Sequence, residues 1–168
     1  MCERSIAAVK RVATVPVFAK LSPNVTDIVA IGKGAEQGGA DGITAINTLI
    51  GMAVDWRKRK PILGRVIGGL SGPAIKPVAL RMVYELARAM RLPILGVGGV
   101  RSSDDVLEFV CAGASAVQVG TAMFTDPALM VRIVDELRDK LAAAKTTIRE
   151  LRGALHRSEP APVGGCAR

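Results

Sequence analysis

Aromatic residues, histidine and cysteine are scarce in this 168-residue chain, with aromatics at 3%, one histidine and three cysteines. So few aromatics argue against the stacking platforms that bind single-stranded nucleic acids, and we expect no nucleic acid partner. Cys2, Cys111 and Cys166 have no metal-ligand spacing and His156 stands alone, so no metal site is expected. The odd cysteine count and the lack of an apolar leader favour a reducing, cytoplasmic location. No stretch approaches the roughly 20 apolar residues of a membrane span, so no membrane association is expected.

Aliphatic residues and positive charge are abundant instead. Hydrophobic residues make up 49% of the chain, which excludes disorder over its whole length, and 168 residues suffice for one domain with a core. The formal charge is +8, but only 57–60 (RKRK) is a run of cations. We interpret that run as a solvated loop, with a binding patch as the alternative. The overall charge favours an anionic ligand or an acidic partner.

Helical and apolar segments alternate along the chain. The sequence predicts helices over 3–14, 26–37, 73–91, 102–111 and 126–144, and buried strands over 17–21, 41–47, 94–98 and 115–120. Continuous apolar strands are typical of a parallel sheet covered by helices. Residues 48–72 form a long connection rich in glycine and charge.

The spacing of these units predicts an α/β fold with about four parallel strands and flanking helices, over residues 1–144. Units of this length suit the repeats of a (β/α)8 barrel, but a whole barrel needs about 250 residues. The chain is therefore either an open doubly wound sheet or half of a barrel. Residues 145–156 are predicted to extend the last helix, and 157–168 to be disordered, so that 145–168 form a separate tail.

Two glycine junctions follow the last two predicted strands, at Gly98-Gly99 and at Gly120-Thr121. Glycine lets a ligand oxygen approach the backbone, and the start of a helix offers unpaired N–H groups to an anion. In barrels, the loops after the last two strands often bind phosphate together with a short extra helix. The junctions therefore predict a phosphate site, with residues 121–124 as the extra helix. Turn chemistry is the alternative.

Polar residues at strand ends extend this prediction to the mouth of the sheet. Lys20 interrupts an apolar strand, and is interpreted either as a cation facing a ligand or as a lysine that reaches solvent. Asn47 and Thr48 end the second strand, where ligands bind, although an Asn-based turn is equally consistent. Ser71 is a candidate cap for the following helix, and Gly72 permits another close ligand approach.

The sequence does not match the other nucleotide-binding and catalytic motifs that we considered. Residues 68–77 lack the GKS or GKT of a phosphate loop, and Arg101 replaces the third glycine of a dinucleotide fingerprint. The aspartates Asp27, Asp41, Asp104 and Asp105 lie at helix starts or turns, where capping explains them. No acid–base pair is predicted. An isomerase or aldolase barrel is disfavoured because Lys20 has no neighbouring carboxylate in sequence.

With these residues in view, the chain resembles the C-terminal half of dihydroorotate dehydrogenases, in particular the NAD-linked class 1 catalytic subunits. The resemblance runs from about residue 15 to 141. It is carried by "PVFAKLSPNVTDI" (16–28), "GGADGITAINTLIGMAVDWRKRKPIL" (38–63), "GGLSGPAIKPVALRMVYE" (68–85) and "PILGVGGVRSSDDVLEFVCAGASAVQVGTA" (93–122). Dihydropyrimidine dehydrogenase shares several of these segments, but "GMAVDWRKRKPIL" (51–63) favours the orotate enzyme.

The resemblance implies a TIM barrel with FMN at its C-terminal mouth and the oxidation of dihydroorotate to orotate in pyrimidine biosynthesis. It also implies a partner subunit with FAD and an iron–sulfur cluster. By family motif, the implied FMN contacts are Lys20, Ile46, Gly72, Gly98, Gly99, Gly120 and Thr121, the last four at its phosphate. The implied substrate contacts are Asn47 and Thr48.

One family feature has no counterpart, because the general-base cysteine of an "NxSCPN"-type motif is missing. No catalytic base is assigned to any of the three cysteines. We therefore interpret the chain as a truncated C-terminal half of an FMN-dependent oxidoreductase that is inactive alone. A dihydropyrimidine dehydrogenase-like fragment and a non-enzymatic half-barrel that binds phosphate or FMN are the alternatives. A half-barrel leaves two open sheet edges, so self-association is expected.

Overall fold

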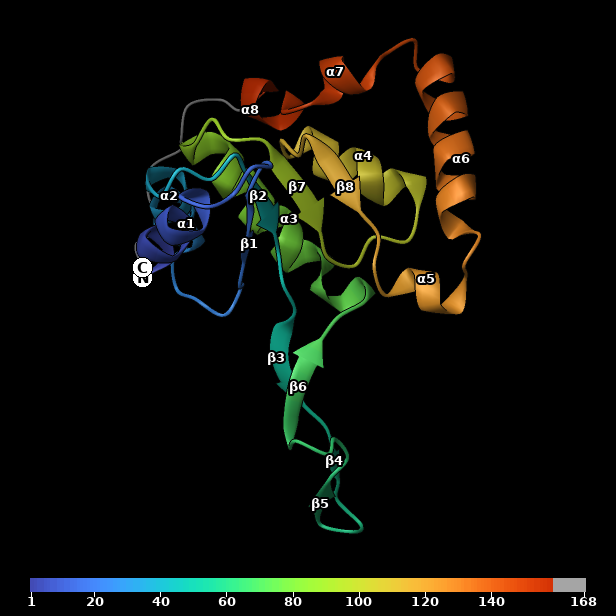
Figure 1. The fold of residues 1–168 in the computed structure, drawn as a ribbon. Coiled ribbons are helices and arrows are strands. Elements are labelled where there is room, and N and C mark those ends of the chain that lie inside the picture. Colours follow the sequence, from blue (N-terminus) through green and yellow to red (C-terminus); the bar gives the residue numbers. More distant parts are fainter. Residues whose placement is uncertain (159–168) are drawn as a thin grey trace.

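The fold, obtained as a computed structural model, is described for residues 1–158 (Figure 1). Strands and helices alternate in the body of the protein. Its elements are α1 (Cys2–Lys10), β1 (Phe18–Leu21), α2 (Ile28–Gln37), β2 (Gly42–Ala45), the 3-10 helix η1 (Pro73–Ile75), α3 (Lys76–Ala89), β7 (Ile94–Val97), α4 (Ser103–Cys111) and β8 (Ala116–Gln118). The order confirms the predicted α/β alternation.

A four-stranded parallel sheet in the order β1-β2-β7-β8 forms the centre of the body. All three pairings are parallel; for example, Lys20 is in register with Thr44 and Gly96 with Val117. Parallel neighbours require a crossover, and α2, α3 and α4 provide it. The four predicted strands and the half-barrel architecture are confirmed.

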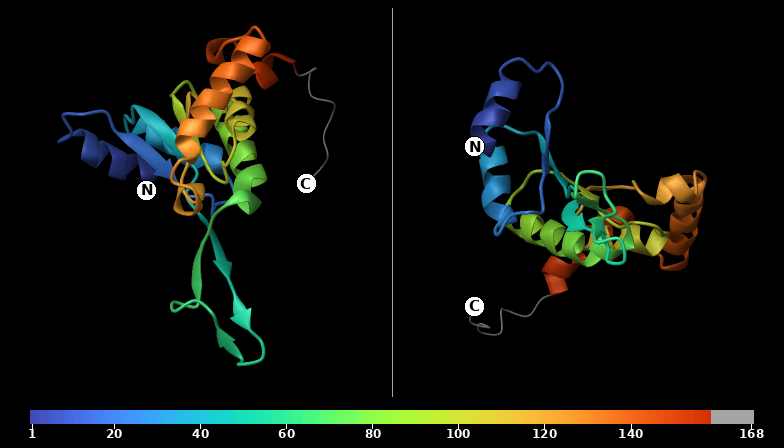
Figure 2. Two further views of the ribbon diagram at one scale, coloured as in Figure 1. Left: turned by 90° about the vertical axis from the view of Figure 1, so that its right-hand side faces the viewer. Right: turned by 90° about the horizontal axis from the view of Figure 1, so that it is seen from below.

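The core lies between the sheet and the helices on one of its faces. Figure 2 shows α2, α3 and α4 along the same side of the sheet. Ile43, Ile94, Leu86 and Phe109 are almost fully buried there. Helix α4 comes very close to β7, because a Cβ built on Gly96 would lie 2.6 Å from Cδ1 of Phe109. The apolar strand residues therefore form the sheet side of an aliphatic core.

The opposite face of the sheet carries none of the helices described in residues 1–158 (Figure 2). Along β1 the side chains alternate, with Ala19 and Leu21 buried and Phe18 and Lys20 exposed. In the last strand Gln118 is likewise exposed. This open face and the helix-covered face together match one wall of a barrel.

The segment predicted as a plain connection, 48–72, is in fact an antiparallel arm. Its strands are β3 (Leu49–Met52), β4 (Val54–Asp55), β5 (Lys60–Pro61) and β6 (Ile67–Leu70), paired β3 with β6 and β4 with β5. The arm projects away from the body, with the basic run 57–60 near its tip (Figure 1). The interpretation of that run as a solvated loop agrees with its exposure.

Helix boundaries differ from the prediction at both ends of the chain. The first helix ends at Lys10 rather than at 14. The predicted extra helix at 121–124 is present as α5 (Ala122–Thr125). The helix predicted over 126–144 is α6 (Leu129–Ala143), which begins three residues later than predicted. None of the helices described in residues 1–158 has the length and the hydropathy that a membrane span requires.

The prediction that 145–156 extend the last helix is wrong: α6 ends at Ala143, and the segment after it forms two short helices, α7 (Ile148–Leu151) and α8 (Ala154–Ser158). The turn before them includes Lys145 with a φ of 50°. His156 of α8 stacks on Tyr84 of α3 with ring centroids 4.6 Å apart. The disorder predicted for 157–168 falls mostly on 159–168, which lie outside the described residues.

Candidate functional site

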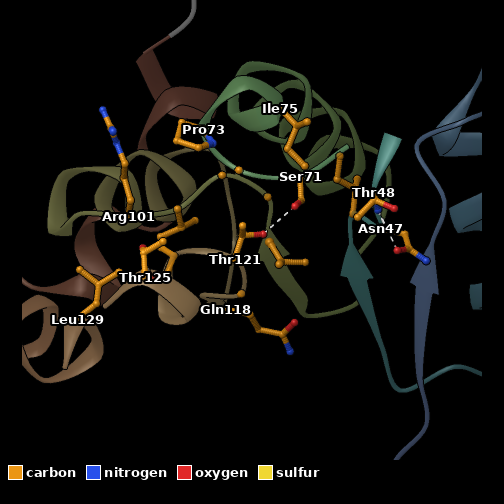
Figure 3. A pocket seen from close by; sticks show the side chains of 18 of the residues that line it. Asn47, Thr48, Ser71, Pro73, Ile75, Arg101, Gln118, Thr121, Thr125 and Leu129 are labelled. Carbon is orange, nitrogen blue, oxygen red and sulfur yellow. Dashed lines mark hydrogen bonds between the residues drawn. The ribbon is translucent and has the colours of Figure 1, made fainter. Parts of the chain in front are cut away.

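The carboxyl ends of the four parallel strands meet at one cavity of about 550 Å³ (Figure 3). The structure brings together every site residue predicted from the sequence. All line this cavity: Lys20, Ile46, Asn47, Thr48, Gly72, Gly98, Gly99, Gly120 and Thr121. Parallel strands end at the same edge of a sheet, which is why segments so distant in sequence converge.

The turn after β7, Gly98-Gly99, packs closely against Gly72 and the first residue of α3. Gly99 has a φ of 76°, and a Cβ there would lie 2.8 Å from the carbonyl oxygen of Gly72 and 2.9 Å from Cβ of Lys76. Gly72 itself has a φ of 86°. Positive φ values and such close approaches both favour glycine. The sequence "GG" at this place is therefore required by the backbone as well as by any ligand.

The turn after β8 is open by contrast. A Cβ on Gly120 would meet no atom within 4 Å. The hydroxyl of Thr121 donates to the hydroxyl of Ser71 over 2.9 Å, so it links this turn to the segment before η1 (Figure 3). Ser71 was a candidate helix cap, but no side chain caps η1 or α3, and the Ser71 hydroxyl is used in this cross-link instead.

Backbone N–H groups of both turns are free. Within residues 1–158, no hydrogen bond leads from the N–H groups of Gly98, Gly99, Gly120 or Thr121 to a protein acceptor. Unpaired N–H groups next to a cavity carry a cost unless water or a ligand accepts from them. Several such donors around one space form an anion-binding concavity.

Asn47 and Thr48 lie on the side of the cavity where the arm begins (Figure 3). The side-chain oxygen of Asn47 accepts from the N–H of Thr48 over 2.8 Å. Asn24 holds the same segment, because its side-chain amide donates to the carbonyl of Thr48 over 3.0 Å and its oxygen accepts from the N–H of Ile50 over 2.9 Å. The hydrogen bond from Thr48 to Asn47 reaches only the adjacent residue, whereas an Asn-based turn bonds to the backbone two residues on, so the Asn-based turn considered as the alternative is not formed here. Within residues 1–158 the side-chain amide nitrogen of Asn47 donates no hydrogen bond.

Positive charge dominates the cavity lining. Lys20, Arg101 and Arg132 line it, and the single lining carboxylate among the described residues is Asp126. Asp126 pairs with Arg132, and the hydrogen bond between them lowers the pKa of the carboxyl and raises that of the guanidinium. Lys20 and Arg101 have no carboxylate partner within residues 1–158. The lining therefore suits an anion.

The sequence analysis did not predict that Arg101, Gln118 and Arg132 line the cavity. It considered Ser71 only as a helix cap, whereas Ser71 also lines the cavity. Gln118 is the outward polar residue of an otherwise apolar strand, a signal of the same kind as Lys20. Arg101 is two residues beyond Gly99, and this closeness to the glycine turn was a signal for it in the sequence. Arg132 is six residues beyond Asp126 in the next helix, and the sequence carried no signal for it.

Acid–base groups are sparse at this site. The described part of the lining contains neither cysteine nor histidine. Cys111 is the last residue of α4, outside the lining, and burial raises the pKa of its thiol. No group of three or more histidine, cysteine or acidic residues in 1–158 is arranged to hold a metal ion. The cavity is therefore equipped to bind and orient an anion, while its described residues offer no free general base.

Comparison with known proteins identifies a matching family and several sequence relatives of this chain. The family model described as dihydroorotate dehydrogenase matches residues 1–141. Three relatives carry the name dihydroorotate dehydrogenase B (NAD(+)), catalytic subunit. The one from Halalkalibacterium halodurans is 59% identical over 79% of this chain and 44% of its own length. Those from Alkaliphilus metalliredigens and Fusobacterium nucleatum are 53% and 55% identical over 92% and 89% of this chain, and 52% and 49% of their own. The chain thus spans about half the length of these relatives.

Proposed function

The chain belongs to the dihydroorotate dehydrogenase family, and we propose that it forms the FMN-binding part of an oxidoreductase of pyrimidine biosynthesis that converts dihydroorotate to orotate. One observation carries the proposal: two turns with free N–H groups, Gly98-Gly99 and Gly120-Thr121, face the same cavity as Lys20 and Asn47. The names of the relatives favour dihydroorotate over a dihydropyrimidine as the substrate.

The phosphate of FMN fits the two turns. Its doubly charged oxygens are acceptors only, and the four N–H groups of Gly98, Gly99, Gly120 and Thr121 are donors without protein partners in residues 1–158. The open space beside Gly120 leaves room for an oxygen against the backbone. Arg101 adds a positive charge to the same lining. These features support a dianion at this end of the cavity.

The remaining lining residues fit a flavin ring and a pyrimidine. FMN, when bound, supplies the ring that accepts hydride from the substrate. Lys20 holds a positive charge on the open face of the sheet, where it stabilises negative charge that develops on a bound ligand. Ile46 and Gly72 offer apolar and bare-backbone contact to a flat ring, and Asn47 and Thr48 present polar groups to a pyrimidine.

Partners belong to the same proposal. The relatives are named catalytic subunits, which supports a second subunit, and we propose one that carries FAD and an iron–sulfur cluster. The open sheet face and edges support self-association of the chain. The cytoplasmic location stays a prediction from the cysteine count.

A phosphate- or FMN-binding domain without catalysis is the second candidate. It is favoured by the lack of a free general base among the described lining residues. A single-turnover experiment separates the two candidate functions. It measures the reduction of bound FMN by dihydroorotate as a loss of flavin absorbance. Slow reduction that depends on dihydroorotate supports the oxidoreductase, since the described lining residues offer no free general base for fast turnover, whereas bound FMN that stays oxidised supports the binding domain.

A fluorescence titration of the chain with FMN tests the shared part of both candidates. Riboflavin is the matched control, because it has the same ring and lacks the phosphate. We expect FMN to bind at least about tenfold more tightly than riboflavin, since charge-assisted hydrogen bonds to the phosphate are lost with riboflavin. Absence of FMN binding up to millimolar concentrations, or equal affinity for both, contradicts the proposed phosphate site.

A further inference from the structure

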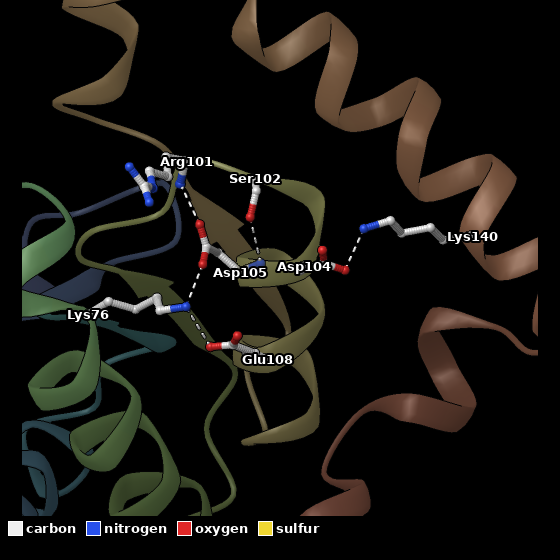
Figure 4. Close-up of polar contacts among 7 residues, drawn as sticks. All are labelled: Lys76, Arg101, Ser102, Asp104, Asp105, Glu108 and Lys140. Carbon is white, nitrogen blue, oxygen red and sulfur yellow. Dashed lines mark hydrogen bonds and ion pairs between the residues drawn. The ribbon is translucent and has the colours of Figure 1, made fainter.

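An ion pair lies beside the cavity without lining it. The ammonium of Lys76 is 2.5 Å from Oδ1 of Asp105 and 2.9 Å from Oε2 of Glu108 (Figure 4). Lys76 is the first residue of α3 and Asp105 lies in the first turn of α4, so the pair joins the starts of two helices. Only 6% of Asp105 is exposed. None of these three residues belongs to the cavity lining.

The second oxygen of Asp105 holds the backbone of the glycine turn. Oδ2 accepts from the N–H of Arg101 over 2.8 Å, and the N–H of Asp105 donates to the hydroxyl of Ser102 over 3.2 Å (Figure 4). Arg101 is two residues beyond Gly99. One buried carboxylate therefore ties Lys76 to the end of the glycine turn that lines the cavity.

The two side chains are both ionised at neutral pH. Burial alone would raise the pKa of Asp105, but hydrogen bonds from Lys76, the N–H of Arg101 and Ser102 outweigh it and lower that pKa. Hydrogen bonds to Asp105 and Glu108 raise the pKa of Lys76. The ammonium of Lys76 is thus paired with two carboxylates and is not available to bind a ligand.

The glycine turn also rests directly on Lys76. A Cβ on Gly99 would lie 2.9 Å from Cβ and 3.0 Å from the backbone nitrogen of Lys76. No gap separates the turn from the start of α3, so a shift of one displaces the other. The ion pair and this contact together clamp residues 98–101 from both ends.

We propose that Lys76 and Asp105 are positioning residues for the phosphate site, because their pairing keeps the N–H groups of Gly98 and Gly99 aimed into the cavity. This inference rests on the FMN site proposed above. The pair acts through the backbone and touches no ligand. Its loss therefore weakens recognition of the phosphate and leaves recognition of the ring in place.

The test compares FMN and riboflavin affinities of the full 168-residue chain and its Asp105→Asn variant. Asparagine keeps the acceptor for the N–H of Arg101 but loses the charge that holds Lys76. We expect the ratio of riboflavin to FMN dissociation constants to fall about tenfold, since a buried ion pair that loses one partner is strongly weakened. The riboflavin constant itself should stay within about twofold, a split that general destabilisation does not produce.

Two variants serve as controls. Asp104→Asn changes the neighbouring aspartate, which pairs with Lys140 of α6 (Figure 4). Within residues 1–158 the Asp104 side chain makes no hydrogen bond to the glycine turn, so this variant should leave the ratio unchanged. Lys76→Arg keeps the positive charge and should preserve most of the ratio. If Asp105→Asn does not fold, the double variant Lys76→Gln/Asp105→Asn leaves no unpaired buried charge and replaces it.

The outcomes distinguish the inference from the proposed function. A wild-type chain without a preference for FMN over riboflavin overturns the phosphate site itself. A wild-type preference that survives in Asp105→Asn, or in the double variant, overturns only the positioning role. A fall in the ratio for Asp105→Asn together with an unchanged ratio for Asp104→Asn supports it.

Discussion

The hydroxyl of Thr121 donates to the hydroxyl of Ser71 over 2.9 Å and so connects two segments 50 residues apart in the chain. On the other side, Gly99 packs against the carbonyl of Gly72. The turns after β7 and β8 are therefore both fastened to the segment that leads from the arm into α3. These three loops form one wall of the cavity. A substitution in any of them should therefore change the affinity of the proposed phosphate site.

Replacement of Gly99 by alanine should cost both stability and ligand affinity. The positive φ and the 2.8 Å approach to the carbonyl of Gly72 leave no room for a Cβ. We expect the free energy of unfolding to fall by about 1–3 kcal/mol, as in other overpacked sites, and the FMN preference over riboflavin to be lost. Urea unfolding and the two flavin titrations measure these effects.

Gly120→Ala is the matched comparison, because a Cβ there meets open space. Its stability should stay within about 0.5 kcal/mol of wild type, while the added methyl group occupies ligand space and weakens FMN binding. Equal stability losses for the two alanine variants would contradict the different roles assigned to the two turns.

Lys20→Met should weaken both flavins equally. Lys20 is exposed on the open face of the sheet and lines the cavity with the other predicted ring contacts, so its loss leaves the phosphate turns intact. We expect about fivefold weaker binding of FMN and of riboflavin, as for one lost hydrogen bond, with unchanged thermal stability. Lys58→Met, at the exposed tip of the arm, is the control and should change neither affinity. A selective loss of FMN in Lys20→Met would assign Lys20 to the phosphate instead.

Acid should destabilise the chain through Asp105. Its pKa is lowered in the folded state relative to the ordinary value of 3.8, so its stabilising contribution is complete above that value and is lost as the pH falls through the folded-state pKa. Between about pH 5 and pH 2, the free energy of unfolding should decrease more steeply for wild type than for Asp105→Asn. Parallel pH profiles of the two proteins would show that the pairing contributes no stability.

Self-association should depend on the open sheet edges. β1 and β8 each have one strand neighbour, and Ala116 on β8 is exposed. A charge on an edge strand opposes strand pairing between molecules. Sedimentation velocity should therefore show oligomers for wild type and a shift toward monomer for Ala116→Lys. Ala144→Lys, at the end of α6 and away from the sheet, should behave as wild type. A purely monomeric wild type would contradict the expectation.

Much of the body and of the site was predictable because both depend on local pattern. The apolar runs around Ile43 and Ile94 indicated buried parallel strands, and strands of that kind place their carboxyl ends together. Lys20, Asn47 and the two glycine junctions were noticeable as polar or bare positions directly at those ends. The topology then brought all of them to one cavity.

The arm and the ion pair were not predictable for physical reasons. Strands β3 to β6 bury little, so the alternation that marks a half-buried strand is weak, and their stability comes from pairing across the arm. Asp105 looked like a helix cap, yet Ser102 is the cap and Asp105 pairs with Lys76, 29 residues away. Such a partner depends on how α3 and α4 pack and leaves no mark in the local sequence.

The most direct test of the account follows the backbone amides of the two turns by NMR while inorganic phosphate and then FMN are added. The account predicts that the N–H signals of Gly98, Gly99, Gly120 and Thr121 shift together, with one dissociation constant for each ligand, while an arm residue such as Trp56 does not shift with them. Signals that stay in place, or that titrate with separate constants for the two turns, would contradict a single phosphate held between them.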